Sequence, residues 1–160
     1  MPAFFGSEGP GRIDISRLMS QSTRQLTRAA ATFAAGRGDT ELDVLHVLRV
    51  MTEHDSVQGL MQRAGAEPGS VADVVTQRLP HGITPVSGTA PSLSAALKAA
   101  LLSAHQVAQA LGSTYIDPEH LFIAFASDPD QLVGRLLAEQ GITPQSMQRA
   151  IQGIDEDEET

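Results

Sequence analysis

The chain has 160 residues, of which about half are apolar once the 14 glycines are counted, as is typical of a globular protein. Its formal net charge of −8 and the lack of a basic stripe argue against nucleic acid as a partner. No cysteine is present, which excludes disulfides and thiolate metal sites and favours a cytoplasmic location, and no apolar run is long enough to predict a membrane partner.

Aromatic residues are scarce, with five phenylalanines, one tyrosine and no tryptophan. The core must therefore be packed mainly with Ala, Leu, Val, Ile and Met. Closely packed alanine-rich helices suit that inventory, whereas a sheet would want more β-branched and aromatic residues. The composition predicts an all-α protein.

The chain begins with a Gly- and Pro-rich segment, residues 1–12, which we expect to be flexible. Apolar residues then recur at three- and four-residue steps from Ile15 to Phe33, and this spacing predicts an amphipathic helix that Gly36 and Gly38 end.

Three shorter helices complete a first unit over residues 13–79. Asp43 is a predicted N-cap for a helix that runs to about Thr52, Gly65 closes the third helix, and Pro68 opens the fourth. Residues 80–91, with three prolines and two glycines, then predict a linker.

A second unit over residues 92–152 repeats this order. Ser92 or Ser94 begins a long helix through Leu93 that Gly112 stops, and Asp117-Pro118 combines an N-cap with proline at the first helical position. The seventh helix is expected from Asp130 to Gln140, and Thr143-Pro144 begins the eighth. The acidic residues 153–160 are expected to form a solvated, disordered tail or linker.

The two units share one layout. His46 and His120 are 74 residues apart, and Gly38 and Gly112 keep that offset. Downstream, Gly65 and Gly141 are 76 residues apart, which a two-residue loop insertion explains. Eight helices in a pseudo-twofold duplication of a four-helix motif are therefore the predicted architecture. A unit of about 65 residues has a marginal core on its own, so we expect both copies to share one compact body.

No catalytic constellation stands out. The five histidines lack the helical spacing of a zinc site, no serine lies in a nucleophile elbow, and no glycine-rich loop cradles phosphates. His46 and His120, at equivalent positions, are interpreted as structural histidines. The sequence predicts a protein that is not an enzyme and needs no cofactor or metal.

The segment Tyr115-Ile116-Asp117-Pro118-Glu119-His120-Leu121, echoed around His46, resembles the amino-terminal domain of the Clp-type AAA+ unfoldases, the ClpC, ClpA and ClpB type. The resemblance covers roughly residues 13–152. It implies two copies of a four-helix motif that bind adaptor proteins and substrate polypeptides and present them to the ATPase ring of the same or a related chain. It also implies that the domain does not hydrolyse ATP.

In ClpC-type members the domain binds phosphorylated arginine, so the resemblance implies ligand residues here. Glu119 matches the glutamate that receives the guanidinium, Ser94 after Leu93 matches a threonine position, and Lys98 would add positive charge. In the first copy Leu45 stands at the glutamate position. A carboxylate in the first turn of a helix also commonly serves only as a partner of the helix dipole, and that reading stays open for Glu119.

We therefore expect a non-catalytic substrate- and adaptor-docking domain of a Clp-type unfoldase that acts in protein quality control or regulated proteolysis. The alternative is a standalone regulator that sequesters adaptors or small-molecule ligands of the unfoldase. The coding sequence beyond Thr160 distinguishes them, because only the first requires Walker motifs to follow.

Overall fold

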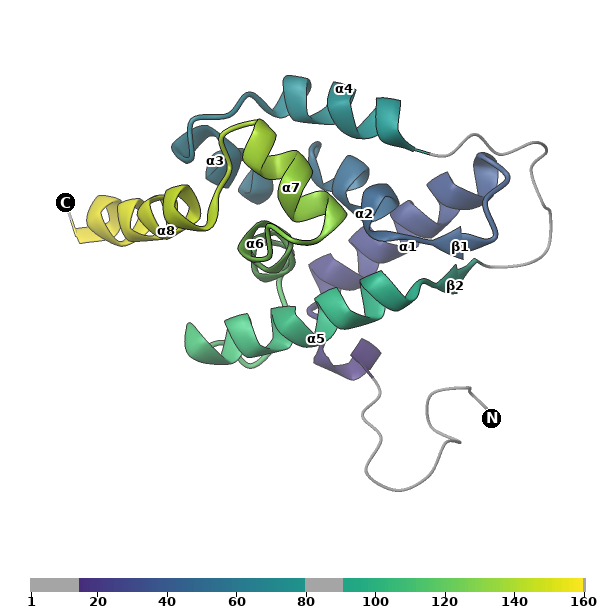
Figure 1. Ribbon diagram of the computed structural model, residues 1–160. Helices are drawn as coiled ribbons and strands as arrows, with labels where there is room; N and C mark the ends of the chain where they lie inside the picture. The colour runs from purple at the N-terminus through teal and green to yellow at the C-terminus, as the bar shows by residue number, and fades with distance from the viewer. Residues whose placement is uncertain (1–14, 80–90, 160) are drawn as a thin grey trace.

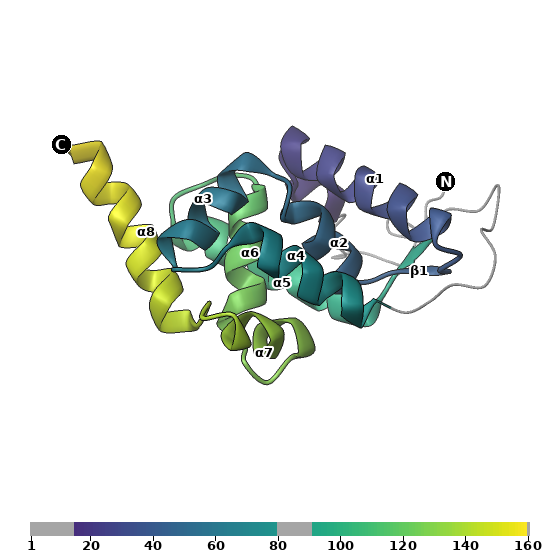
Figure 2. The same cartoon turned by 90° about the horizontal axis from the view of Figure 1, so that it is seen from above.

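The computed structural model describes residues 15–79 and 91–159, which form eight α-helices (Figures 1 and 2). The first repeat contains α1 (Gln21–Gly36), α2 (Val44–Met51), α3 (Asp55–Arg63) and α4 (Pro68–Arg78). The second contains α5 (Ala95–Ala110), α6 (Pro118–Ser127), α7 (Leu132–Glu139) and α8 (Pro144–Glu159). A short 3₁₀ turn, η1 (Ile15–Leu18), precedes α1, and two two-residue strands, β1 (Glu41–Leu42) and β2 (Ser92–Leu93), precede α2 and α5. The all-α fold is confirmed, while the expected flexible segment 1–12 and nearly all of the linker 80–91 lie outside the described residues.

Two backbone pairings join the repeats, and each is the copy of the other. Leu42 pairs with Leu93 in the parallel β1–β2 ladder, and Met19 pairs with Ile116 in an isolated parallel bridge. At the 74-residue offset, Met19 is equivalent to Leu93 and Leu42 is equivalent to Ile116. The pseudo-twofold axis that relates the repeats therefore converts each of these two pairings into the other. Each repeat thus supplies one strand to the other, as in a self-complementary dimer interface.

The matching histidines begin α2 and α6 in the same way. The Nδ1 atom of His46 accepts a hydrogen bond from the backbone N–H of Asp43 at 2.9 Å, and Nδ1 of His120 accepts one from Asp117 at 2.8 Å. Both aspartates are N-caps, and each histidine stands three residues later, so the pairs form capping boxes. The structural interpretation of these two histidines is confirmed.

Four helices end on a glycine with positive φ, and these glycines match across the repeats: Gly38, Gly65, Gly112 and Gly141. At the end of α1, Gly38 N–H donates to the carbonyl of Ala35 and the next N–H, of Asp39, donates to that of Ala34. This is the Schellman pattern, and the left-handed backbone it needs favours glycine. The glycine stops expected from the sequence are confirmed.

One hydrophobic core runs through both repeats, with α6 at its centre. In Figure 1 α6 is seen end-on, with α5 below it and α3 and α7 above. Every residue from His120 to Ala126 is buried, including Phe122 and Phe125, whereas α1, for example, buries only one face. The expectation of one shared body is confirmed.

Four predicted boundaries were wrong for reasons that involve the partner repeat or the helix end. The first helix begins at Gln21, not near Ile15, because Met19 pairs with Ile116 and Ser20 caps the helix. Leu93 lies in β2 rather than in the fifth helix, because it pairs with Leu42 and leaves Ser94 as the N-cap.

The eighth helix continues to Glu159, through the segment expected to be a disordered tail. No proline interrupts it, and glutamate is a good helix former. Figure 2 shows this helix leaving the body at the end of the molecule opposite the β1 strand. The seventh helix begins at Leu132 instead of Asp130, since Gln131 takes the N-cap position.

Candidate functional site

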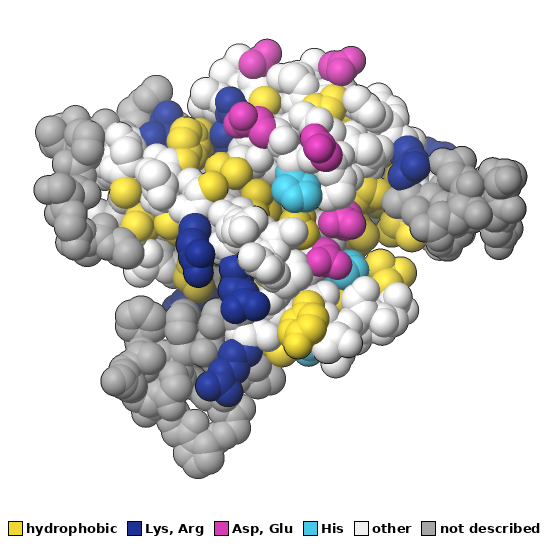
Figure 3. Space-filling view, turned by 180° about the vertical axis from the view of Figure 1, so that it is seen from behind, with side chains coloured by type: hydrophobic (Ala, Val, Ile, Leu, Met, Phe, Trp, Pro, Cys, Tyr) yellow, Lys and Arg dark blue, Asp and Glu magenta, His cyan; other side chains and the backbone are white. Residues whose placement is uncertain are grey.

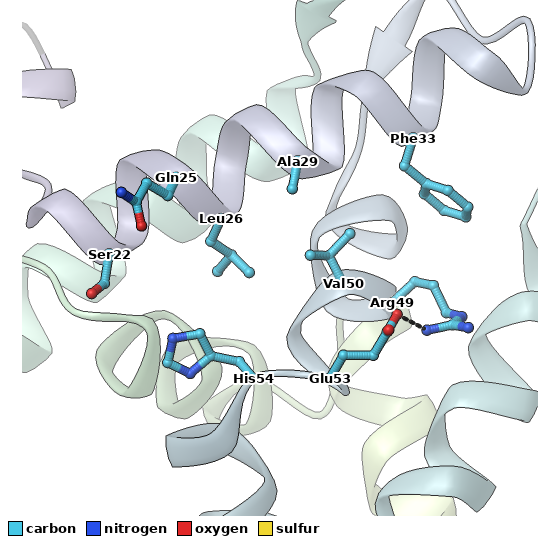
Figure 4. A pocket seen from close by; sticks show the side chains of 9 residues that line it. All are labelled: Ser22, Gln25, Leu26, Ala29, Phe33, Arg49, Val50, Glu53 and His54. Carbon is cyan, nitrogen blue, oxygen red and sulfur yellow. Dashed lines mark hydrogen bonds and ion pairs between the residues drawn. The ribbon is translucent and has the colours of Figure 1, made fainter.

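A groove with a volume of about 530 Å³ lies between α1 and α2 on the first repeat (Figure 4). We call it groove A. It is lined by nine residues: Ser22, Gln25, Leu26, Ala29, Phe33, Arg49, Val50, Glu53 and His54. In Figure 4 the side chains of Leu26, Ala29 and Val50 face one another across its middle, while polar side chains stand at its ends. The arrangement suits a ligand with apolar side chains and polar flanks.

The spacing of the α1 residues explains the groove. Ser22, Leu26, Ala29 and Phe33 recur at three- and four-residue steps, so they share one face of the helix. Ala29 offers only a methyl group there and is exposed, which leaves space between α1 and α2.

Phe33 closes the end of groove A that lies opposite His54, and it contacts both a histidine ring and an arginine. Phe33 meets the His46 ring edge-on, with ring centroids 6.1 Å apart and an interplanar angle of 76°. The guanidinium of Arg37 lies 5.6 Å from the centroid of the Phe33 ring, within range of a cation–π contact.

Arg49 and Glu53 form the charged wall of groove A. Their ion pair measures 2.9 Å from Nη1 to Oε2, and Arg49 Nε also donates to Thr76 Oγ1 at 3.0 Å. The side chain of Glu53 is 73% exposed and that of Arg49 only 28%. Thr76 of α4 thus fixes the position of the Arg49 guanidinium. The exposed carboxylate of Glu53 can exchange its partner at little cost in free energy, as is usual for exposed ion pairs.

A second, smaller groove of about 210 Å³ lies between α5, α6 and α7, and we call it groove B. Its residues Ala96, Ala99, Ala100, Ser103, Ala124 and Asp128 match Ser22, Gln25, Leu26, Ala29, Val50 and His54 of groove A at the 74-residue offset. The duplication has therefore produced two equivalent grooves with different chemistry. Groove B has alanine where groove A has glutamine and leucine, and no Arg49 counterpart lines it.

The site residues predicted from the motif are not brought together as expected. Ser94 is buried; its hydroxyl donates to Asp43 Oδ1 at 2.7 Å and accepts from Leu97 N–H, so it is committed to two helix starts. Leu93 lies in β2, and Lys98 is exposed one turn into α5. Among the described residues, no hydrogen bond or ion pair joins Glu119 to Ser94 or Lys98. Glu119 and Ser94 lie apart because the segment before α6 pairs with Met19 and Ser20 of the first repeat, and not with the start of α5 in its own repeat.

Glu119 instead contacts α3, the third helix of the first repeat. Ser56 Oγ donates to Glu119 Oε1 at 3.0 Å and lies 2.9 Å from Nδ1 of His54. The side chain of Glu119 is partly buried. It therefore links the two repeats next to the end of groove A, where His54 lies.

The sequence patterns did not reveal groove A, because it depends on which face of α1 the other helices leave uncovered. The only sequence signal that could have indicated the groove is the polar Gln25 and the small Ala29 on either side of buried Leu26. The Pro118-Glu119-His120 motif drew the prediction instead, but its proline occupies the first turn of α6 and its histidine forms the capping box with Asp117.

Catalysis has no support in this geometry. Ser56 donates its only hydroxyl proton to a carboxylate, so it is not activated by His54, which would have to accept that proton. Within residues 15–79 and 91–159, no three His, Asp or Glu side chains are placed to hold a metal ion. None of the helices in the described ranges combines the length and apolar character that crossing a bilayer requires.

These features define a duplicated helical domain with two solvent-facing grooves and a shared core. The chain belongs to the Clp repeat (R) N-terminal domain family, whose family model matches residues 18–152. Clp N-domains are non-catalytic docking domains of Clp-type unfoldases, so the resemblance seen in the sequence is confirmed.

Among curated relatives, the chaperone protein ClpB of Mycobacterium tuberculosis is 32% identical over 132 residues. This alignment spans 80% of the chain but 15% of ClpB. The ClpB of Rhodopseudomonas palustris is 28% identical over 141 residues, 84% of the chain and 16% of the relative. The chain thus corresponds to about a sixth of the length of these relatives.

Solved structures share the fold at lower identity. The N-domain of ClpV from Vibrio cholerae superposes with a TM-score of 0.75 at 20% identity, covering 91% of this chain and 92% of the other. The N-terminal domain of Hsp104 from Candida albicans gives a TM-score of 0.68 at 20% identity, covering 83% and 89%. A complex of a ClpV N-domain with a VipB peptide gives 0.73 at 19% identity, covering 89% and 92%.

Proposed function

We propose that this chain is the substrate- and adaptor-docking domain of a cytoplasmic Clp-type AAA+ unfoldase that acts in protein quality control or regulated proteolysis. Groove A carries the proposal, because it is the larger of the two grooves and offers apolar surface from exposed Ala29 and half-buried Phe33 and Val50, beside buried Leu26. The ClpV N-domain complex with a VipB peptide supports it by example, since that N-domain has the same fold.

The proposed ligand is an extended or helical segment of an adaptor or an unfolded polypeptide. Leu26, Ala29 and Val50 would contact its apolar side chains, and the exposed carboxylate of Glu53 would contact its polar or basic flanks. The bound polypeptide would then pass to the AAA+ ring of the same or a related chain. The C-terminal part of α8, which leaves the body in Figure 2, is where a connection to such a ring would begin.

The test replaces Ala29 with glutamate, which puts a charge on the floor of groove A without touching the core. Thr32→Glu is the matched control, because Thr32 is exposed on the same helix and lines neither groove. The ligands are fluorescent fifteen-residue peptides tiled along a permanently unfolded protein, and binding is measured by anisotropy. We expect Ala29→Glu to abolish binding of the apolar peptides and Thr32→Glu to leave it unchanged. Equal binding by both variants would refute groove A as the docking site.

We further propose that Glu119 receives the guanidinium of arginine-phosphorylated partners. The serine next to the start of α6 is Ser20 rather than Ser94, because the Ser20 N–H donates to the carbonyl of Ile116. One oxygen of Glu119 accepts from Ser56, and no hydrogen bond of the described residues engages the other. Lys98 and Leu93 stay proposed ligand contacts on a separate part of the surface, beside α2 of the first repeat. Buried Ser94 would take part only by giving up its hydrogen bond to Asp43. Figure 3 shows basic side chains gathered below the centre of this face, while acidic side chains lie nearer its top and centre, one of them beside another basic side chain.

Calorimetric titration with free phosphoarginine tests this finer proposal. Glu119→Ala should lower the affinity about tenfold or more, since a hydrogen bond to a charged group contributes about 1.5–3 kcal/mol. Leu45→Ala, at the equivalent position of the first repeat, removes no charge and should leave the affinity unchanged. Absence of heat with the wild-type domain would eliminate phosphoarginine as a ligand and leave groove A unaffected.

A further inference from the structure

The histidine at the end of groove A belongs to a hydrogen-bond chain that crosses between the repeats. His54 Nδ1, Ser56 Oγ and Glu119 Oε1 are linked in that order by contacts of 2.9 and 3.0 Å. His54 is the N-cap of α3, Ser56 lies in the first turn of α3, and Glu119 lies in the first turn of α6. The chain thus connects groove A to the second repeat, although Ser56 and Glu119 do not line the groove.

The direction of the protons in this chain follows from the donors each group has. An ionised carboxylate only accepts hydrogen bonds, so the single hydroxyl proton of Ser56 must point to Glu119. The Ser56 oxygen then has only lone pairs to offer His54. A neutral His54 must therefore carry its proton on Nδ1 and leave Nε2 bare.

The bare nitrogen faces the place where a ligand would lie. In Figure 4 the His54 ring stands at the end of groove A below Ser22 and Leu26, with one ring nitrogen turned toward these residues. Nδ1 is held by Ser56, so the nitrogen available to the groove is Nε2. The charged groups around it are Glu53 in the turn between α2 and α3, Asp55 beside it in the chain and Glu119 through Ser56, and Arg49 is paired with Glu53.

We infer that Glu119 and Ser56 fix His54 as a hydrogen-bond acceptor in groove A, which makes the groove selective for segments that bring a donor next to an apolar side chain. This inference rests on the proposed docking function. The ligand class is a polypeptide segment with a serine or threonine hydroxyl beside leucine, valine or phenylalanine. An aliphatic residue at the donor position would leave Nε2 desolvated and unpaired, which disfavours it. His54 contacts the ligand, whereas Ser56 and Glu119 are positioning residues.

The tautomer is tested without any ligand, by long-range ¹H–¹⁵N NMR of the histidine side chains in the folded chain. Wild type should show neutral His54 protonated on Nδ1. In Glu119→Ala the Ser56 hydroxyl is free to donate to Nδ1, so the proton should move to Nε2. Ser56→Ala is the second variant, in which the Nδ1 preference should also be lost. His120, which accepts at Nδ1 from the backbone, is an internal reference protonated on Nε2 in all three proteins. A wild-type His54 protonated on Nε2 would overturn the inference.

Selectivity is tested with a pair of peptides that bind groove A and differ only by threonine or valine at one position, scanned along the sequence. At the position that meets His54, wild type should prefer threonine by about two- to tenfold, the range expected for one hydrogen bond. Glu119→Ala should lose or reverse that preference while still binding the apolar residues. Equal affinities for the two peptides at every position would refute the inference. If no peptide binds, docking at groove A fails, and the NMR result still decides the state of His54.

Discussion

The two equivalent histidines make the same helix-start bond but differ in their other contacts. His46 and His120 both cap a helix start through Nδ1, but among the described residues only His46 makes a second hydrogen bond, from Nε2 to Asp39 Oδ2 at 2.8 Å. Because Nδ1 accepts in both, Nε2 carries the proton and donates to the carboxylate. At the position equivalent to Asp39 the second repeat has Ser113. Alanine at each histidine should therefore cost different amounts.

The expected costs follow from these contacts. Loss of the capping box costs about 0.5–2 kcal/mol at either site. His46→Ala also removes a bond to a charged group, which adds about 1.5–3 kcal/mol. For a domain of this size about 1 kcal/mol shifts Tm by ~2–4 °C, so His46→Ala should melt ~3–12 °C below His120→Ala. Glutamine, which is favoured at this capping-box position, should restore much of the loss at His120.

Thermal and urea unfolding of the two alanine variants measure this difference, and a double-mutant cycle with Asp39→Ala assigns it. The coupling between Asp39 and His46 should account for most of the gap. Equal destabilisation by the two alanine substitutions, or a cycle with no coupling, would show that the Asp39 bond does not stabilise the fold.

Three further predictions concern the body and its end. Calorimetry should show one unfolding transition, because both repeats share a core, and two separated transitions would contradict this. Gly134→Ala should destabilise by about 3 kcal/mol or more in urea unfolding, since a Cβ there would collide with the backbone carbonyl oxygen of Asp128. Gly59→Ala, in open space within α3, should instead stabilise by about 0.5–1 kcal/mol, and equal effects would refute the packing of α7. Deletion of residues 155–159 should leave Tm nearly unchanged, whereas a drop of several degrees would show that this segment docks on the body.

The features that could be predicted from sequence are those encoded within a few residues. Asp117, Pro118 and Gly112 fix where helices begin and end through local backbone preferences, and the copies at a constant offset revealed the duplication. The helix count and the all-α class follow from these signals.

The features that escaped prediction depend on residues far apart in the chain. Met19 was assigned to a helix by its spacing, but its pairing with Ile116 forms only when both repeats are present. Glu119 was assigned a ligand role from its motif, while its structural partner Ser56 is 63 residues away. Groove A was missed because an exposed Ala29 looks the same in sequence whether or not a neighbouring helix leaves space beside it.

The central claim is that groove A docks polypeptide segments, and methyl NMR tests it most directly. The methyl groups of Leu26, Ala29 and Val50 line the groove, whereas those of Leu121 and Ile116 are buried in the core away from it. Titration with an apolar peptide from the tiled set should shift and broaden the groove methyls, with intermolecular NOEs to the peptide, and leave the core methyls unchanged. Binding that perturbs the methyls of groove B or another surface, with groove A unaffected, would contradict the account.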